Sequence, residues 1–291
     1  MYKKDLVSQI LINIRNMTLI VASKLNGKFL LSSDSRLTIN SKENLFTDKC
    51  VKIYSIPVKI IVKKFTNEGV KQETSLIYEK KWCMAMAGSF YTSLMIKNLM
   101  SELLSSIAIV DGGHSFKFED ICNYILNLFK SVSKSMLPIL REGGTCIFFI
   151  GGFDPEIKKL RTFLFYHKIV DGFYQPYYEE APVKENKYLS FGSGVATMIK
   201  HGNLNSGVFN SLKNIVNDKT DSSIGGKVQY GYFNKNNDFE ILRILEGFVD
   251  MDGKKMPIAS FLSFDFGSDK LIHGKFCPGH YGMMANELDK K

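Results

Sequence analysis

Apolar and polar residues alternate along the first third of the chain in the manner of β-strands. Residues 18–22 and 28–33 form two such segments, and the Asn-Gly pair between them supplies the positive φ angles of a tight hairpin turn. Residues 49–56 predict a further strand, and residues 56–88 predict a long hairpin with its own turn signal. We therefore expect this part of the chain to be rich in antiparallel strands.

After these strands the apolar residues recur at helical spacing, and the two patterns then alternate in blocks. Helices are expected at residues 89–109, 118–136 and, as a pair, at about 195–218, with strands at 143–154, 160–170, 225–233 and 239–245. Strands and helices that follow each other in blocks are typical of an α+β fold, with helices packed on the outer faces of two mainly antiparallel sheets. No long Pro/Gly linker or repeat divides the chain, so we expect one domain.

Composition narrows the classes of function. The 291 residues have a formal net charge of +9, but the lysines are dispersed and no nucleic-acid-binding motif accompanies them, so we expect no nucleic-acid partner. No apolar run is long enough for a membrane span, and we expect no membrane partner. Five scattered cysteines, mostly in apolar segments, suit reduced thiols and a cytoplasmic protein.

The hairpin at residue 18 begins with a threonine, and a threonine at an N-terminus is a self-contained catalytic unit. Its hydroxyl can attack a carbonyl carbon while its own α-amine, with a pKa of about 8, takes the proton. Thr18 can act in this way only if the peptide bond after Met17 is absent in the mature protein. Residues 1–17 carry no recognisable signal-peptide cleavage site.

Short motifs follow Thr18 in a fixed order: TLIVASKLNGKFLLSSDSRLT, CVKIYSI, CMAMAGS, FGSG and DSSIGG. Together they resemble the motifs of proteasome β-subunits and their bacterial relatives, which are N-terminal-nucleophile hydrolases. The match runs from Thr18 to about Tyr232. The resemblance implies a four-layer αββα sandwich and a threonine-type endopeptidase that cleaves peptide bonds without a cofactor.

The resemblance also implies a role for individual residues. Thr18 is the nucleophile, Asp34 and Lys52 are its charged partners, and the backbone N–H of Gly88 faces the oxyanion. A lysine held charged beside the threonine favours a neutral α-amine and stabilises the alkoxide.

Three further residues match accessory positions of the same family. Ser193 and Asp221 fall at a serine and an aspartate that hydrogen-bond around the threonine, and Met86 falls at a side chain that lines the pocket for the residue before the cleaved bond. The chain departs from the pattern at Ile224, which stands where many proteasome subunits have a serine before the paired glycines.

The expected domain organisation is an N-terminal extension of residues 1–17, which is a propeptide or a mis-assigned start, and a hydrolase domain of residues 18–291. We expect a hairpin insertion near residues 60–82 and a C-terminal extension after Gly247. Methionine aminopeptidases remove an initiator methionine before a small residue, so a start at Met17 exposes Thr18. The resemblance further implies a peptide or unfolded-protein substrate, a homo-oligomeric ring and an unfolding ATPase as partners.

Two other functions are compatible with the same residues. If residues 1–17 are retained, the chain is a non-catalytic ring or scaffold subunit. If its substrate is a small amide instead of a peptide, the chain is an N-terminal-nucleophile amidase. His273, Cys277 and His280 have spacings that suit zinc, but only three such ligands gather there, and we expect no metal site. The glycine-rich segments lack a phosphate-binding arrangement, so we expect no nucleotide.

Overall fold

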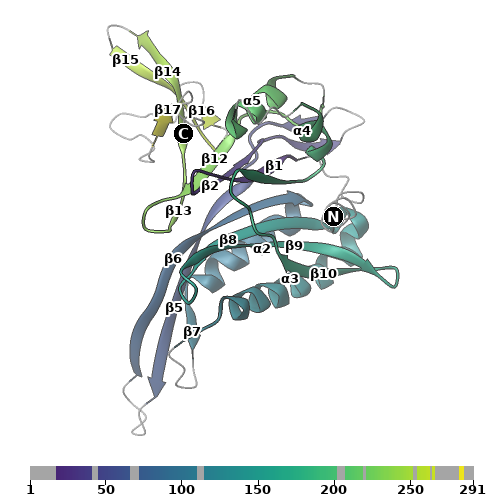
Figure 1. The fold of residues 1–291 in the computed structure, drawn as a ribbon. Coiled ribbons are helices and arrows are strands. Elements are labelled where there is room, and N and C mark those ends of the chain that lie inside the picture. The colour runs from purple at the N-terminus through teal and green to yellow at the C-terminus, as the bar shows by residue number, and fades with distance from the viewer. Residues whose placement is uncertain are drawn as a thin grey trace.

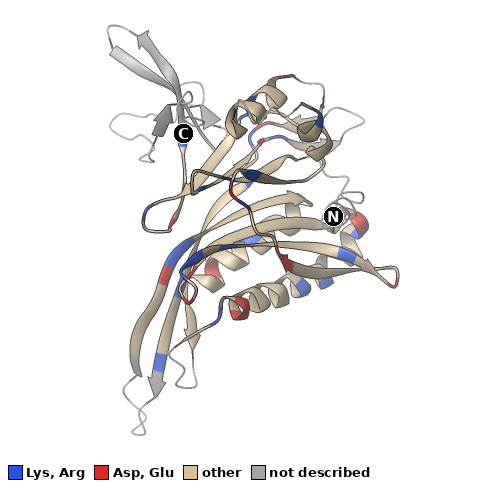
Figure 2. Cartoon of the chain, in the orientation of Figure 1, with Lys and Arg blue, Asp and Glu red and all other residues tan. Residues whose placement is uncertain are grey.

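The computed structural model describes residues 18–40, 45–65, 72–109, 115–201, 207–218, 221–251, 254–262, 264–265 and 282–284. Strands and helices form separate layers, and the expected α+β class is confirmed (Figure 1). Lys and Arg are spread over strands and helices instead of gathering on one element, as the sequence predicted (Figure 2). Within the described residues, no helix is both long enough and apolar enough to cross a membrane.

The first sheet has five antiparallel strands in the order β11-β1-β2-β12-β13. Their bounds are Ile20–Leu25 (β1), Lys28–Ser33 (β2), Lys187–Phe191 (β11), Gln229–Phe233 (β12) and Phe239–Ile241 (β13). The hairpin of β1 and β2 turns at Asn26 and Gly27, whose φ angles are 50° and 75°. The hairpin predicted from the Asn-Gly pair is therefore confirmed.

The second sheet has six strands in the order β10-β9-β8-β6-β5-β7, and only the short β7 runs parallel to its neighbour. The bounds are Ile53–Phe65 (β5), Gln72–Gly88 (β6), Ile107–Ile109 (β7), Cys146–Asp154 (β8), Lys159–Val170 (β9) and Phe173–Glu180 (β10). The long hairpin predicted for residues 56–88 is β5 and β6. Residues 107–109 were expected to end a helix; instead they pair with residues 60–62 of β5.

Helices lie against the outer face of each sheet. They are α2 (Phe90–Leu104), α3 (Phe118–Leu140), α4 (Val195–His201) and α5 (Val208–Asp218), with a short 3-10 helix, η1, at Arg141–Gly144. The Ser89 hydroxyl accepts a hydrogen bond from the N–H of Thr92, which fixes the start of α2 directly after β6.

Two small sheets complete the described fold. β3 (Leu37–Asn40) pairs with β4 (Leu45–Thr47). The other sheet has the order β16-β15-β14-β17, with bounds Arg243–Met251 (β14), Lys254–Phe261 (β15), Phe264–Asp265 (β16) and Gly282–Met284 (β17). The sequence predicted an extension after Gly247 but no sheet there.

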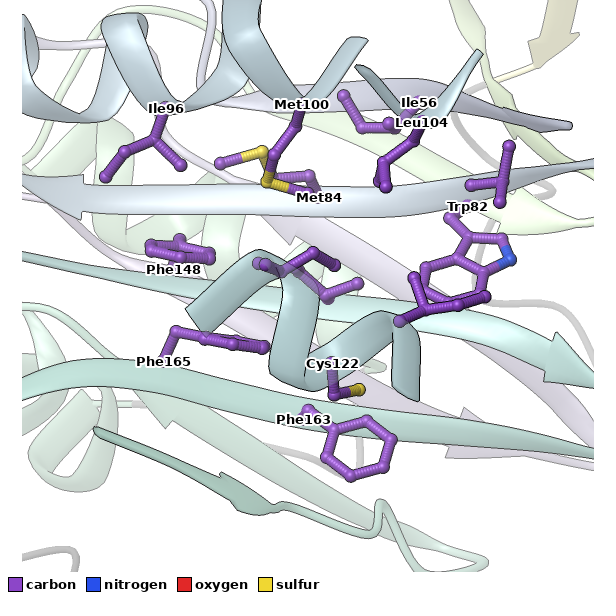
Figure 3. Packing of buried hydrophobic residues seen from close by; sticks show 14 of the residues in the cluster. Ile56, Trp82, Met84, Ile96, Met100, Leu104, Cys122, Phe148, Phe163 and Phe165 are labelled. Atoms are coloured by element: carbon purple, nitrogen blue, oxygen red, sulfur yellow. The ribbon is translucent and has the colours of Figure 1, made fainter. Parts of the chain in front are cut away.

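Three buried clusters hold these layers together. One lies between the two large sheets and contains Ile20 and Leu31 of the first and Ala85 and Phe149 of the second. A second joins the six-stranded sheet to α2 and α3, and a third joins the five-stranded sheet to α4 and α5. Figure 3 shows the second cluster, in which Phe148 and Phe165 stack with ring centroids 4.9 Å apart.

The strand β8 shows why its sequence is an unbroken apolar run. Ile147 and Phe149 point into the cluster between the sheets, whereas Phe148 and Ile150 point into the cluster under the helices. Successive side chains of a strand face opposite sides, so a strand covered on both faces needs apolar residues at every position. Burial on both faces therefore places β8 in the middle of the molecule.

His167 of β9 is a buried basic group beneath α3. The N–H of Cys146 donates to His167 Nδ1 at 3.2 Å, and the Nε2 atom is 2.9 Å from the Ser133 hydroxyl oxygen. Burial lowers the pKa of His167 from 6.5 to about 4. The neutral imidazole is therefore the form that the folded protein holds near neutral pH.

This histidine makes part of the stability depend on pH. Between its folded pKa of about 4 and its ordinary value of 6.5, the unfolded chain binds a proton that the folded chain does not, so stability falls as the pH falls through this window. In this window His167 makes the free energy of unfolding fall by up to about 1.4 kcal/mol for each pH unit of acidification. We expect the variant His167→Gln to lack this pH dependence. Urea unfolding of the wild type and the variant at pH 7, 6 and 5 measures this difference. If the free energy of unfolding changes with pH equally in the two proteins, the prediction is wrong.

Candidate active site

Thr18 lies two residues before β1, and its backbone N–H and carbonyl group both form hydrogen bonds. Its N–H donates to the Ser193 hydroxyl at 3.1 Å, and its carbonyl oxygen accepts from the N–H of Gly194 at 3.1 Å. The side chain is almost wholly buried, with 6% of the residue exposed. The structure thus brings together two residues that are 175 positions apart in the chain and that the sequence predicted as site residues.

The loop after β11 approaches Thr18 closely because it lacks side chains. Gly192 has a φ angle of 96°, and a β-carbon there would collide with the carbonyl oxygen of Thr18. A β-carbon on Gly194 would lie 2.6 Å from the Ile224 Cδ1 atom. The glycines of the FGSG motif therefore let Ser193 reach the N–H of Thr18.

Asp34 is completely buried, and donors surround its carboxylate. Its Oδ1 atom accepts from Lys52 Nζ at 2.8 Å and from the N–H of Leu19 at 2.9 Å. Its Oδ2 atom accepts from the N–H groups of Arg36 at 3.1 Å and Gly225 at 3.3 Å. These donors replace the water that the carboxylate loses on burial, which is the condition for burying a charge.

Lys52 is the cation of this pair, and it is also buried, with 3% of its side chain exposed. Gln229 of β12 fixes its backbone: the side-chain oxygen accepts from the N–H groups of Lys52 at 2.9 Å and Ile53 at 3.3 Å, and the side-chain nitrogen donates to the Cys50 carbonyl at 2.6 Å. Sequence analysis missed Gln229. The sequence marks Gln229 only as a polar residue among the apolar residues of a predicted strand.

Arg36 is a second residue whose importance the sequence did not predict. Its guanidinium forms a two-point ion pair with Asp48, at 2.6 Å and 2.9 Å, and donates to the carbonyl of Ser222 at 3.2 Å. A β-carbon on Gly225 would collide with this guanidinium. Arg36 therefore holds the loop that carries Gly225 against the buried carboxylate of Asp34.

A small pocket of about 20 Å³ gathers most of the predicted residues. Thr18, Lys52, Met86 and Gly88 contribute to its lining; the others are Leu37, Cys50, Ala87, Phe90 and Ser93. Gly88 ends β6 with a φ angle of 98°, and a β-carbon there would lie 2.7 Å from the Cα atom of Cys146. Its position at a strand-to-helix junction agrees with the sequence prediction.

Asp221 takes a different place. Its carboxylate accepts from the Thr197 hydroxyl at 2.9 Å and from the N–H of Ser223 at 3.0 Å, as well as from the Ser223 hydroxyl. It is not among the described residues that line the pocket. Asp221 therefore contacts the loop before Ile224 and the helix α4, and its predicted contact with the threonine is not among these bonds.

Cys50 places a thiol at the pocket. Burial raises the pKa of its thiol to about 11, although the neighbouring Lys52 acts in the opposite direction. The thiol is therefore protonated at neutral pH and a weak nucleophile. Among the described residues, no cluster of His, Cys, Asp and Glu suits a metal ion. His273, Cys277 and His280, whose spacing the sequence analysis considered for zinc, lie outside the described residues.

Comparison with known proteins gives only distant similarity. No family model matches the chain, and no curated protein matches it. The fold is similar to that of Anbu (ancestral beta-subunit) from Yersinia bercovieri, with a TM-score of 0.49 and 15% identity over 74% of this chain and 81% of that chain. It is also similar to a Gly-1 mutant of Anbu from Hyphomicrobium sp. strain MC1, with a TM-score of 0.49 and 12% identity over 84% and 87%.

These findings correct the family assignment made from the motifs. The sequence was expected to belong with proteasome β-subunits and the bacterial threonine peptidases related to them, and that assignment is wrong. The two similar structures named here are both Anbu proteins, and at 15% and 12% identity they give no basis for transferring a residue's role.

The buried ion pair predicts a large effect on stability. Asp34→Asn leaves Lys52 buried without its counter-charge, so we expect the free energy of unfolding to fall by about 3–5 kcal/mol. The matched control is Asp48→Asn in the pair with Arg36, whose side chains are 38% and 13% exposed; water can reach this pair in part, so its loss should cost less than that of the Asp34 pair. Urea unfolding followed by circular dichroism measures both. If the free energy of unfolding falls equally in the two variants, burial of the Asp34 pair does not determine the size of the effect.

Proposed function

We propose that the protein is an N-terminal threonine hydrolase that cleaves peptide bonds. The active form is residues 18–291, and it arises when residues 1–17 are removed. The observation that carries the proposal is the buried pair of Lys52 and Asp34, with Nζ and Oδ1 2.8 Å apart, at a pocket that Thr18 also lines. Burying a lysine and a carboxylate is costly, and a buried ionisable pair at a pocket is a candidate for a functional site.

The reaction needs only groups of this chain and water. The Thr18 hydroxyl attacks the carbonyl carbon of the scissile amide, and its proton passes to the free α-amine of Thr18. That proton then moves to the nitrogen of the leaving amine as the amide bond breaks, which leaves an ester on Thr18. A water molecule hydrolyses the ester and restores the hydroxyl.

Three groups support these steps electrostatically. The cation of Lys52 disfavours protonation of the α-amine and stabilises the alkoxide. The Ser193 hydroxyl, 3.1 Å from the Thr18 nitrogen, orients the amine and its proton. The N–H of Gly88 faces the oxyanion, a contact that is typically worth about 3 kcal/mol in the transition state. Asp221 binds Thr197 and Ser223, so its role is to hold the loop before Ile224 against α4.

The pocket indicates which substrates fit. Met86, Leu37 and Phe90 give it apolar walls, and its volume of about 20 Å³ leaves room for little more than a methyl group without movement of these side chains. We propose that a small apolar residue precedes the cleaved bond. The apolar preference agrees with the position of Met86 that the sequence indicated.

We also propose the order of the layers and the location of the protein. The clusters between the sheets and beneath the helices support a four-layer αββα sandwich. The described cysteines at positions 50, 83, 122 and 146 are free and buried, which supports a reducing, cytoplasmic location. An unfolding ATPase as partner stays a prediction.

Activity of a chain that begins at Thr18 is the decisive test. That form should hydrolyse small apolar fluorogenic peptides, whereas the chain with residues 1–17 should be inactive because the nitrogen of Thr18 is then an amide. Thr18→Ala should lower the rate by about 10³-fold or more, and Thr18→Ser should keep part of it. Unchanged turnover in Thr18→Ala would exclude this nucleophile; inactivity of every form would favour a non-catalytic subunit.

We also propose that copies of the chain assemble into a ring. An apolar stripe on α2, composed of Tyr91, Met95, Leu99 and Leu103, is 68%, 40%, 38% and 39% exposed. Their spacing of four residues places them on one side of the helix. Exposed aromatic residues and methionine with few charges are typical of the centre of a protein interface.

The stripe gives a direct test of assembly. Met95→Glu combined with Leu99→Glu should reduce the particle mass in light scattering to that of one chain, because two buried carboxylates oppose contact. Asn127→Glu, on the exposed side of α3, is the control and should leave the mass unchanged. A monomeric wild-type protein, or an assembly that survives the double change, would contradict this part of the proposal.

A further inference from the structure

A second and much larger hollow lies away from Thr18, between the C-terminal half of α3 and the start of β10. Its volume is about 540 Å³, within the range of sites for small molecules. The lining residues are Lys130, Ser133, Lys134, Leu137, Pro138, Gly172, Phe173, Tyr174, Gln175 and Pro176. Figure 1 shows α3 running alongside β10, the strand at the edge of the sheet. None of these residues lines the pocket of Thr18.

The walls of this hollow are mainly apolar. Leu137 and Pro138 come from the last turn of α3, and Phe173 and Pro176 come from β10. Phe173 is 73% exposed, so its ring offers apolar surface at the hollow that a ligand could cover. A ligand that fills the hollow would remove apolar surface from water and gain the corresponding free energy.

Two cations stand at the same hollow. Lys130 and Lys134 are one helical turn apart on α3, a spacing at which like charges repel each other. In the described part of the chain, no carboxylate forms an ion pair with either of them. The hollow therefore combines apolar walls with an uncompensated positive charge.

We propose that this hollow binds an amphipathic monocarboxylate, with the carboxylate at Lys130 and Lys134 and the apolar body against Leu137, Phe173 and Pro176. Lysines supply point charges without the fork of an arginine, which suits one small anionic head. A free fatty acid and the C-terminus of an apolar peptide share this chemistry. The site does not depend on Thr18 or on the hydrolase activity.

Calorimetric titration of the full chain with octanoate tests the site. The double variant K130Q/K134Q removes both cations of the hollow. The control is K28Q/K59Q, which changes the net charge equally at two exposed lysines on other strands. Acetate lacks the apolar body and methyl octanoate lacks the charge. An apolar tripeptide, tested with a free and with an amidated C-terminus, distinguishes the two sources of the carboxylate.

We expect saturable binding of octanoate or of the free-acid tripeptide to the wild type and to the control. The double change K130Q/K134Q should weaken the binding of either acid about tenfold, as the loss of a charge-assisted hydrogen bond does. Acetate, methyl octanoate and the amidated tripeptide should bind the wild type no more tightly than octanoate binds the double variant. Binding should also weaken as salt rises. Equal affinity in K130Q/K134Q, equal affinity for methyl octanoate, or no saturable binding of either acid would overturn the proposal.

Discussion

The carboxylate of Asp34 is the group around which the site is organised. A completely buried negative charge is tolerated only when donors replace its water. Here one donor, the N–H of Arg36, lies in the turn of Asp34 itself, and the others come from three distant segments at Leu19, Lys52 and Gly225. Each segment must hold its position for the others to keep theirs. The position of Lys52 beside the threonine pocket is therefore a consequence of the same electrostatic requirement.

The site also requires that two loops pass very close to Thr18 and Arg36, and this explains the glycines at positions 192 and 225. Gly192 and Gly225 stand where a β-carbon would collide with Thr18 and with Arg36. The layers behind them are held by apolar packing, with β8 covered on both faces. Rigid sheets thus carry a polar site at their ends, where loops without side chains bring distant segments within hydrogen-bonding distance.

Local signals in the sequence predicted local structure well. The Asn-Gly turn and the helical spacing after Ser89 and Phe118 gave the first hairpin, α2 and α3, because each signal acts within a few residues. The strand β7 and the sheet of β14 to β17 were missed because strand pairing decides them. Gln229 was missed for the same reason: its partners at Cys50 and Lys52 are distant in the chain. The motifs brought together residues that share one pocket, Thr18, Lys52, Met86 and Gly88, but they misled on the family, since short glycine and aspartate motifs reflect local backbone geometry.

The separation in sequence of the groups around Thr18 has a consequence for biosynthesis. Ser193 contacts residue 18 across 175 positions, and Gly225 contacts Asp34 across 191. Contacts of such range form late, after the loops between them have closed. A nascent chain that has not yet reached residue 225 lacks both the donor at Asp34 and the loop that Arg36 holds. A partly translated chain therefore does not yet hold the arrangement of groups around Thr18 that the complete fold shows.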